Sequence, residues 1–360
     1  MGKNRNFSAS YKSAICKMIV CGLVLLGLLI AGCQFEQRVV ETPFGGDDVQ
    51  IPQGMTEEEA ATLLSLEQID DYPLYTMIYQ VDYSDGHTGA ALVDSIAEGP
   101  AWACSLFVVL GNSEELLFGR NFDWDFSPGL LLFTDPPDGY ASVSMVDLYY
   151  LGYGGDQAFG ITDLPLSERA DLLDAPLIPF DGMNETGLVV GMAAVPDGGM
   201  VYDPEKETID SVLVIRKILD QAASIEEAAA IIKNYNIDMG TGPSLHYLIA
   251  DRSGRSALVE FTHGDVVVIY NQEPWQQATN FLFSESPTPP ESQCWRYGLI
   301  GNRLRANEGE LNFSQAMRLL EDVAQESTQW SVVYGFSAGK IEVVMGGKYH
   351  RVHKMDFEMK

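Results

Sequence analysis

Three residues whose types support nucleophilic catalysis lie close together in the sequence: Cys104, Arg120 and Asp123. A cysteine reacts as its thiolate, and a neighbouring cation favours the deprotonated sulfur. A carboxylate can orient the base that removes the proton. The arginine follows the cysteine by sixteen positions (120 − 104), and the aspartate follows the arginine by three (123 − 120). This set therefore predicts a cysteine nucleophile with its supporting charges.

A β-hairpin is the element that would bring these residues together. An apolar, β-branched run follows Cys104, Gly111-Asn112 interrupts it, and a second run at 115–118 leads into Gly-Arg-Asn-Phe-Asp. Two runs of strand length joined by a Gly-Asn turn are typical of a hairpin, whose far end folds back beside its beginning. The same residues would also suit a small buried cysteine and a solvated Arg–Asp pair. Spacing alone leaves both interpretations open.

The composition limits the class of protein. The chain has 360 residues, 46% of them hydrophobic, which is enough for one large domain or two. Its net charge of −29 argues against nucleic-acid binding, because few cations are present to neutralise phosphates. Of the five cysteines, Cys104 and Cys294 lie in the body of the chain. No disulfide framework is predicted, although a single bridge between these two stays open.

Residues 1–33 are typical of a targeting segment. Basic residues precede an apolar run at 18–31, which is too short for a comfortable membrane span. The following Leu-Ile-Ala-Gly-Cys resembles the bacterial lipoprotein box, which implies cleavage before Cys33 and a lipid anchor in the bacterial cell membrane. An uncleaved anchor or a plain secretory leader stays open, and each alternative places the protein outside the cytoplasm. Residues 34–55 are polar, contain Gly, Asp and Pro, and are predicted to be a tether.

The rest of the chain alternates groups of strands with groups of helices. Thr56 with Glu59, and Ser224 with Glu227, form capping-box patterns that each predict the start of a helix. Strands are predicted at 74–83, 130–134, 142–148, 187–194, 245–250, 257–261, 266–270 and 278–283, further helices at 211–223 and 313–325, and a hairpin near the C-terminus. This order indicates antiparallel sheets with helices outside, an α+β layered fold.

Two other patterns do not support a functional role. Gly-Phe-Ser-Ala-Gly at 335–339 matches the G-x-S-x-G nucleophile elbow, but a β-run rather than a helix follows it, so a hairpin turn is predicted. The five histidines show no metal-ligand spacing. His246 is interpreted as a residue of the core or sheet, and neither a metal nor another cofactor is predicted.

Four phrases, in order, resemble the choloylglycine hydrolase group of N-terminal-nucleophile (Ntn) hydrolases, which includes penicillin V acylase and acid ceramidase. The matching features are the Cys, Arg and Asp spacing of the hairpin, Asp-Gly-Met-Asn-Glu-x-Gly-Leu at 181–188, the strand pair SLHYLIAD and ALVEF, and Ala-Thr-Asn at 278–280 followed by Cys-Trp-Arg-Tyr. The resemblance covers about residues 72–349. It implies a four-layer αββα sandwich of antiparallel sheets flanked by helices.

The resemblance also implies roles for individual residues. The α-amine of Cys104, once freed, would act as the base for its own thiol, because an α-amine has a pKa near 7.7–8.0. Arg120 would stabilise the thiolate, and Asp123 would hold the amine. Asn280 would bind the oxyanion of the tetrahedral intermediate, and Arg296 would support the site or bind substrate.

Two features separate this chain from the bile-salt hydrolases of the group. Ala194 stands where those enzymes carry a catalytic asparagine, so a backbone N–H would have to replace one side-chain donor. Self-cleavage between Ala103 and Cys104 would also leave a long pro-segment, 70 residues beyond the lipobox cysteine (103 − 33). Residues 56–103 would form a small chain packed on a catalytic domain at 104–360. Both features favour the ceramidase, amidase and acyltransferase branch.

The sequence therefore predicts an autoprocessed cysteine hydrolase that cleaves a linear N-acyl amide through an acyl-enzyme. Its partners would be the small N-acyl amide, the membrane through the lipid on Cys33, and its own small fragment, held noncovalently. Two alternatives stay open: an acyltransferase that passes the acyl group to an amine, and a binding lipoprotein without catalysis on the same scaffold. Apolar residues in the pocket loops suit a fatty or aromatic acyl group, but the sequence does not name the substrate.

Overall fold

The computed structural model of the protein describes residues 39–40, 49–83, 103–240, 242–286 and 289–360. The predicted signal peptide with Cys33, most of the predicted tether and residues 84–102 of the predicted small chain lie outside this part of the sequence. Within it, every helix is too short or too polar to span a bilayer.

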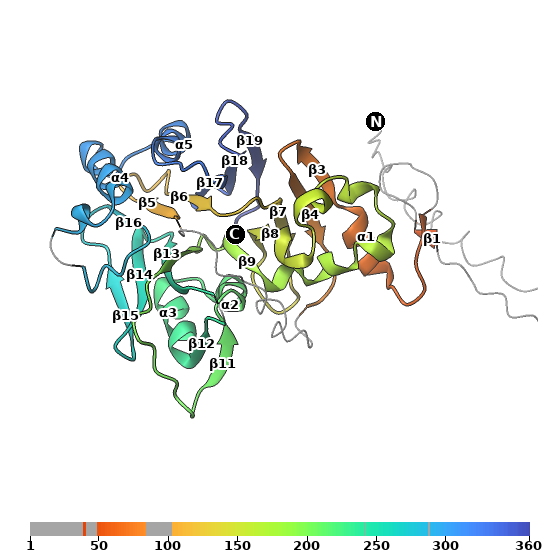
Figure 1. Ribbon diagram of the computed structural model, residues 1–360, viewed down its shortest axis with the longest axis horizontal. Coiled ribbons are helices and arrows are strands. Elements are labelled where there is room, and N and C mark those ends of the chain that lie inside the picture. Colours follow the sequence, from red (N-terminus) through yellow and green to blue (C-terminus); the bar gives the residue numbers. More distant parts are fainter. Residues whose placement is uncertain (1–38, 41–48, 84–102, 241, 287–288) are drawn as a thin grey trace, which may run out of the picture. The chain divides into compact units, whose positions relative to one another are not determined.

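Two large β-sheets form the centre of the fold (Figure 1). The larger has nine strands in the order β15-β14-β13-β10-β9-β8-β7-β4-β3. Neighbouring strands are antiparallel, except that β4 and β7 run parallel. The bounds are β3 Glu67–Asp70, β4 Leu74–Tyr79, β7 Gly129–Thr134, β8 Ser142–Asp147, β9 Pro179–Asn184, β10 Val189–Val195, β13 Ser244–Asp251, β14 Arg255–Thr262 and β15 Asp265–Tyr270.

The second sheet has six strands in the order β16-β5-β6-β17-β18-β19, all antiparallel to their neighbours. The bounds are β5 Ser105–Val109, β6 Leu117–Asp123, β16 Trp275–Ala278, β17 Thr328–Gly335, β18 Lys340–Met345 and β19 His353–Asp356. Two strand pairs lie apart from the large sheets: β1 Val39–Val40 with β2 Val49–Gln50, and the parallel pair β11 Glu207–Asp210 and β12 Tyr235–Asp238.

Helices cover the outer face of each sheet, and the predicted four-layer αββα arrangement is confirmed. Helices α2 (Leu213–Gln221) and α3 (Ile225–Asn234) contact strands of the nine-stranded sheet. Helices α4 (Trp295–Ala306) and α5 (Phe313–Asp322) contact strands of the six-stranded sheet. Strand β5 meets β10 and β13 between the sheets (Figure 1). Short 3₁₀ turns at 148–151, 155–158, 161–163, 166–168 and 170–177 connect β8 to β9, and another lies at 290–292.

The hairpin formed by β5 and β6 is buried on both faces. Leu106 and Val108 belong to the core between the sheets, whereas Phe107 and Val109 belong to the core beneath α4 and α5. This alternation follows from the two-residue period of a strand. Gly119 lies opposite Phe107 in the ladder, where an added Cβ would meet the Phe107 ring at 2.4 Å. The glycine of the Gly-Arg-Asn phrase is therefore needed for packing of the hairpin.

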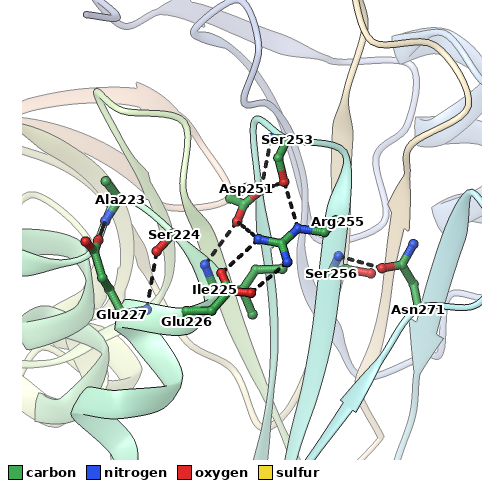
Figure 2. A network of polar contacts seen from close by, with 10 residues as sticks. All are labelled: Ala223, Ser224, Ile225, Glu226, Glu227, Asp251, Ser253, Arg255, Ser256 and Asn271. Carbon is green, nitrogen blue, oxygen red and sulfur yellow. Dashed lines mark hydrogen bonds and ion pairs between the residues drawn. The ribbon is translucent and has the colours of Figure 1, made fainter.

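Charged and polar side chains join α3 to the turn between β13 and β14 (Figure 2). Ser224 accepts a hydrogen bond from the Glu227 N–H, as expected of an N-cap. Asp251 accepts the Ile225 N–H at 3.0 Å, so a carboxylate from the sheet satisfies a second free donor of the helix. Glu226 and Arg255 form a two-bond ion pair on the surface.

Most of the predicted elements are present. The Thr56–Glu59 capping box starts α1 (Glu57–Leu64), and the Gly-Phe-Ser-Ala-Gly phrase forms the predicted hairpin turn between β17 and β18. The strand predicted at 278–283 is wrong, because the strand ends at Ala278 and a loop follows. Helix α4 was not predicted; its two glycines (Gly298 and Gly301) and weakly amphipathic sequence hide it.

Strands β3 and β4, at residues 67–79, are part of the larger sheet. Strand β4 pairs with β7 along its whole length, and Tyr75 and Met77 are fully buried. Asp70 and Asp71, next to β4, form ion pairs with Arg351, and Asp70 also contacts His353 of β19. Burial and charge both hold this segment to the rest of the fold.

Candidate active site

Cys104 lies immediately before β5, where the hairpin register sets it beside the end of β6. Ser105 pairs with Asn121 and Leu106 with Arg120, so the predicted hairpin is confirmed. The Cys104 side chain is buried, with 4% of its surface exposed. Burial raises the pKa of its thiol above the usual value, although the charge of Arg120 opposes the rise. The sulfur is therefore protonated at neutral pH in this structure.

Arg120 belongs to a buried charge network. Its Nη1 donates to Asp181 Oδ2, and the Tyr334 hydroxyl donates to the other oxygen of Asp181 at 2.6 Å. Burial disfavours the guanidinium charge, but Asp181 outweighs it and holds the pKa of Arg120 above its usual value. The positive charge beside Cys104 is thus shared with Asp181. The role of Asp181 was not predicted from the sequence. The feature that could have indicated it is the position of Asp181 at the start of the Asp-Gly-Met-Asn-Glu phrase.

Asp123 ends β6 and is buried. The Thr328 hydroxyl donates to its Oδ1, and Arg296 Nη1 lies 3.8 Å from Oδ2. Among the described residues, Oδ2 has no hydrogen-bond partner. Burial raises the pKa of Asp123 to about 6, against the opposing effect of Thr328 and Arg296. This carboxyl group therefore ionises close to neutral pH.

Arg296, in the first turn of α4, joins several parts of the site. Its Nη1 donates to the backbone carbonyl of Cys104 and, at 2.9 Å, to the Ser105 hydroxyl. Its Nη2 donates to Asn280 Oδ1 at 2.9 Å. Asn280 lies in the loop after β16, and its Nδ2 donates to the Ala194 carbonyl at 2.8 Å. One of the two amide hydrogens of Asn280 is thus engaged with the backbone of Ala194.

A small apolar cavity of about 40 Å³ opens beside Cys104. Its wall contains Cys104 and Arg120 together with Phe122, Trp124, Tyr150, Phe180, Met192, Ala193, Ala194, Ser211, Val212, Met239, Gly242, Pro243 and Leu245. An apolar lining is typical of small-molecule sites, whose volumes are usually about 300–1,000 Å³. The lining suits an apolar group held next to the sulfur.

The predicted site residues fall into two groups around Cys104. Cys104 and Arg120 line the cavity, whereas Asp123, Asn280 and Arg296 form a hydrogen-bonded and ion-paired group at the Cys104 backbone. Ala103, on the other side of the predicted cleavage site, is half-buried. Cys104 and Cys294 are both free thiols. Cys33 lies outside the described residues.

Replacing Asp123 with asparagine is expected to stabilise the fold while it impairs the site. The folded state holds the Asp123 proton more tightly than the unfolded state, so the free energy of unfolding falls as pH rises from 3.8 to about 6. Asparagine avoids this loss, which is worth about 2–3 kcal/mol at pH 7. Urea unfolding at pH 7 and pH 4 measures it, and the advantage of Asp123→Asn should disappear at pH 4.

A second buried carboxyl group provides the control for that experiment. Burial raises the pKa of Asp147, at the end of β8, to about 7. Asp147→Asn should therefore also stabilise the fold at neutral pH, but it should leave the surroundings of Cys104 intact. An Asp123→Asn variant that is less stable than wild type at pH 7 would show that the charged carboxylate is favoured by the fold.

Residues 104–281 match the model of the family described as linear amide C–N hydrolases, choloylglycine hydrolase family, and the match begins at Cys104. Among solved structures, penicillin V acylase from Agrobacterium tumefaciens is similar, with 17% identity and a TM-score of 0.49 over 71% of this chain and 86% of that one. A mutant conjugated bile acid hydrolase from Clostridium perfringens is similar as well, with 17% identity and a TM-score of 0.49 over 71% and 92% of the two chains.

Proposed function

We propose that the chain is a self-cleaving enzyme whose nucleophile is Cys104. Residues 104–281 belong to the linear amide C–N hydrolase family, so the chain is a hydrolase of such bonds. The observation that carries the proposal is the position of this thiol in the wall of an apolar cavity, between a buried cation and a buried carboxyl group. A cysteine that served only for packing would need neither charge.

Self-cleavage in this proposal is an acyl transfer within the chain. The Cys104 sulfur attacks the carbonyl carbon of Ala103, a C–S bond forms, and the C–N bond to the Cys104 nitrogen breaks. Water then hydrolyses the thioester, which leaves the Ala103 carboxylate, a free α-amine and the restored thiol. Burial keeps the thiol protonated before cleavage, so a base is needed. We assign this role to Asp123, which takes the thiol proton and returns it to the leaving nitrogen.

The free α-amine then becomes the base for substrate hydrolysis. With a pKa near 7.7–8.0 it is partly neutral at physiological pH and takes the proton of its own thiol. The thiolate attacks the amide carbon, and the protonated amine gives its proton to the leaving amine. The second amide hydrogen of Asn280 and a backbone N–H would bind the oxyanion, and loss of one such donor typically costs about 10²–10³ in rate. Water hydrolyses the acyl-enzyme.

Arg296 would keep the new chain terminus in place. Its bonds to the Cys104 carbonyl and the Ser105 hydroxyl act on the residue that carries both the nucleophile and the base. In this proposal Asp123 would hold the new amine, and its ion pair with Arg296 would keep that carboxylate in place. The apolar lining of the cavity supports a fatty or aromatic acyl group as the part of the substrate next to the sulfur, and the cavity would have to widen to admit such a group.

The first test is the intact mass and N-terminal sequence of the purified ectodomain, followed by product analysis with N-acyl amides. The proposal expects a fragment that begins at Cys104 and, during turnover, an acyl adduct on that fragment. Free acid as the product, with or without an added amine, supports a hydrolase, whereas transfer to the amine supports the acyltransferase alternative. A chain that stays uncut would overturn the proposal, because it has no free α-amine.

We expect the two fragments to stay together after cleavage. Strand β4 lies inside the larger sheet, and its buried residues would be exposed by separation. Co-elution in size-exclusion chromatography, with separation only in denaturant, is the expected result. If the lipid is on Cys33, the whole enzyme then stays at the outer face of the cell membrane. A large fragment released freely into solution after processing would contradict this proposal.

A further inference from the structure

Glu260, a fully buried carboxylate on β14, binds the loop that carries Asn280. Its Oε1 accepts the Phe283 N–H at 2.7 Å, and its Oε2 accepts the Ser284 N–H at 2.9 Å. His246 Nδ1, on the neighbouring strand β13, lies 3.3 Å from Oε1. Both carboxylate oxygens therefore have partners, and two of those partners are backbone groups of one loop.

The loop depends on such side-chain bonds because it leaves the sheet at Ala278. A backbone bond from Phe281 to the Thr279 carbonyl makes a tight local turn, but it does not join the loop to the sheet. Glu260 supplies that connection three residues after Asn280. A second connection comes from the Thr262 hydroxyl of β14, which donates to Glu285.

A buried carboxylate is costly to retain unless its hydrogen bonds are satisfied. At Glu260 burial works against the charged form, but the bonds from His246 and Ser284 outweigh it and lower the pKa of the carboxyl group. The residue is thus an ionised acceptor for two backbone N–H groups. Its position on β14, which is paired on both sides by β13 and β15, makes it a rigid support for the loop.

We propose that Glu260, held by His246, is a positioning residue that sets Asn280 for binding the oxyanion. This inference rests on the proposed function, since it assumes that Asn280 is an oxyanion donor. Asn280 meets Ala194 and Arg296 at the same time, so the position of its loop sets both contacts. Glu260 holds the same loop a few residues further along the chain, at Phe283 and Ser284.

The variant Glu260→Gln tests the proposal. The amide keeps the size of the side chain but replaces one acceptor oxygen with a donor, so one of the two backbone bonds is lost. We expect kcat to fall about tenfold, less than for removal of the oxyanion donor itself, with KM little changed. Glu226→Gln is the matched control, because Glu226 is exposed and lies on α3; it should leave kcat unchanged.

A double-mutant cycle with Asn280→Ala separates positioning from a general loss of stability. If Glu260 acts through Asn280, Glu260→Gln has little further effect in the Asn280→Ala background. An equal fold-loss in both backgrounds would overturn the proposal. An Asn280→Ala variant with wild-type kcat would instead contradict the proposed oxyanion role. Should Glu260→Gln fail to fold, Glu260→Asp, which keeps the charge but shortens the reach, takes its place; full activity of that variant overturns the proposal.

Hydrogen exchange gives a result that does not depend on activity. The amides of Phe283 and Ser284 should exchange faster in Glu260→Gln than in wild type, while the amides of β14 stay protected. Unchanged exchange at both positions would overturn the positioning role even if the enzyme is active. Faster exchange in a protein with no amidase activity would support the loop attachment and count against the proposed function.

Discussion

Replacing Cys104 with alanine leaves the chain uncut and reduces amide hydrolysis to background. Alanine has no sulfur to attack the Ala103 carbonyl, so no α-amine is released and neither nucleophile nor base is present. Loss of the nucleophile in covalent catalysis costs about 10⁶ in kcat, and a decrease of at least about 10⁴-fold is expected here. Intact mass, N-terminal sequencing and steady-state rates measure both effects.

Cys294→Ala is the control for this variant, because Cys294 is the other free thiol among the described residues. It should be cut and active like wild type. Cys104→Ser adds a finer comparison, since a hydroxyl is a weaker nucleophile that remains protonated. Cleavage of Cys104→Ala at the same bond would show that another group, or a contaminating protease, makes the cut.

Replacing Asp181 with asparagine should destabilise the fold by about 3–5 kcal/mol, the usual cost of removing one partner from a buried ion pair. Arg120 and Asp181 are both buried, with at most 1% of either side chain exposed. The variant leaves the guanidinium without a countercharge in a place that water does not reach. Urea unfolding at pH 7 gives the change in the free energy of unfolding.

The exposed pair of Glu226 and Arg255 provides the contrast (Figure 2). About half of each side chain is exposed, so Glu226→Gln should cost only about 0–1 kcal/mol despite its two short bonds. Equal destabilisation by the two variants would mean that burial does not set the strength of the Arg120 pair. A stable Asp181→Asn protein would mean that water or another group reaches Arg120.

The sequence by itself determined the local elements around the nucleophile. The hairpin from Cys104 follows from two apolar runs with a Gly-Asn turn, and the helix at 57–64 follows from its capping box. Both depend on residues only a few positions apart. The phrases that resemble the hydrolase group are also short stretches of the chain, and the family match over 104–281 agrees with those that lie within it. Helix α4 was missed because its own sequence carries little helical pattern.

Only the tertiary structure decided which partners the buried charges have. Arg120 meets Asp181 from the other sheet, Arg296 reaches the Cys104 carbonyl across 192 sequence positions, and Asn280 turns one amide hydrogen to Ala194. A propensity or a turn signal contains no information about such distant pairs. They are set when two sheets pack face to face and each buried charge must find a countercharge or a hydrogen bond. The same packing forms the apolar cavity beside the sulfur.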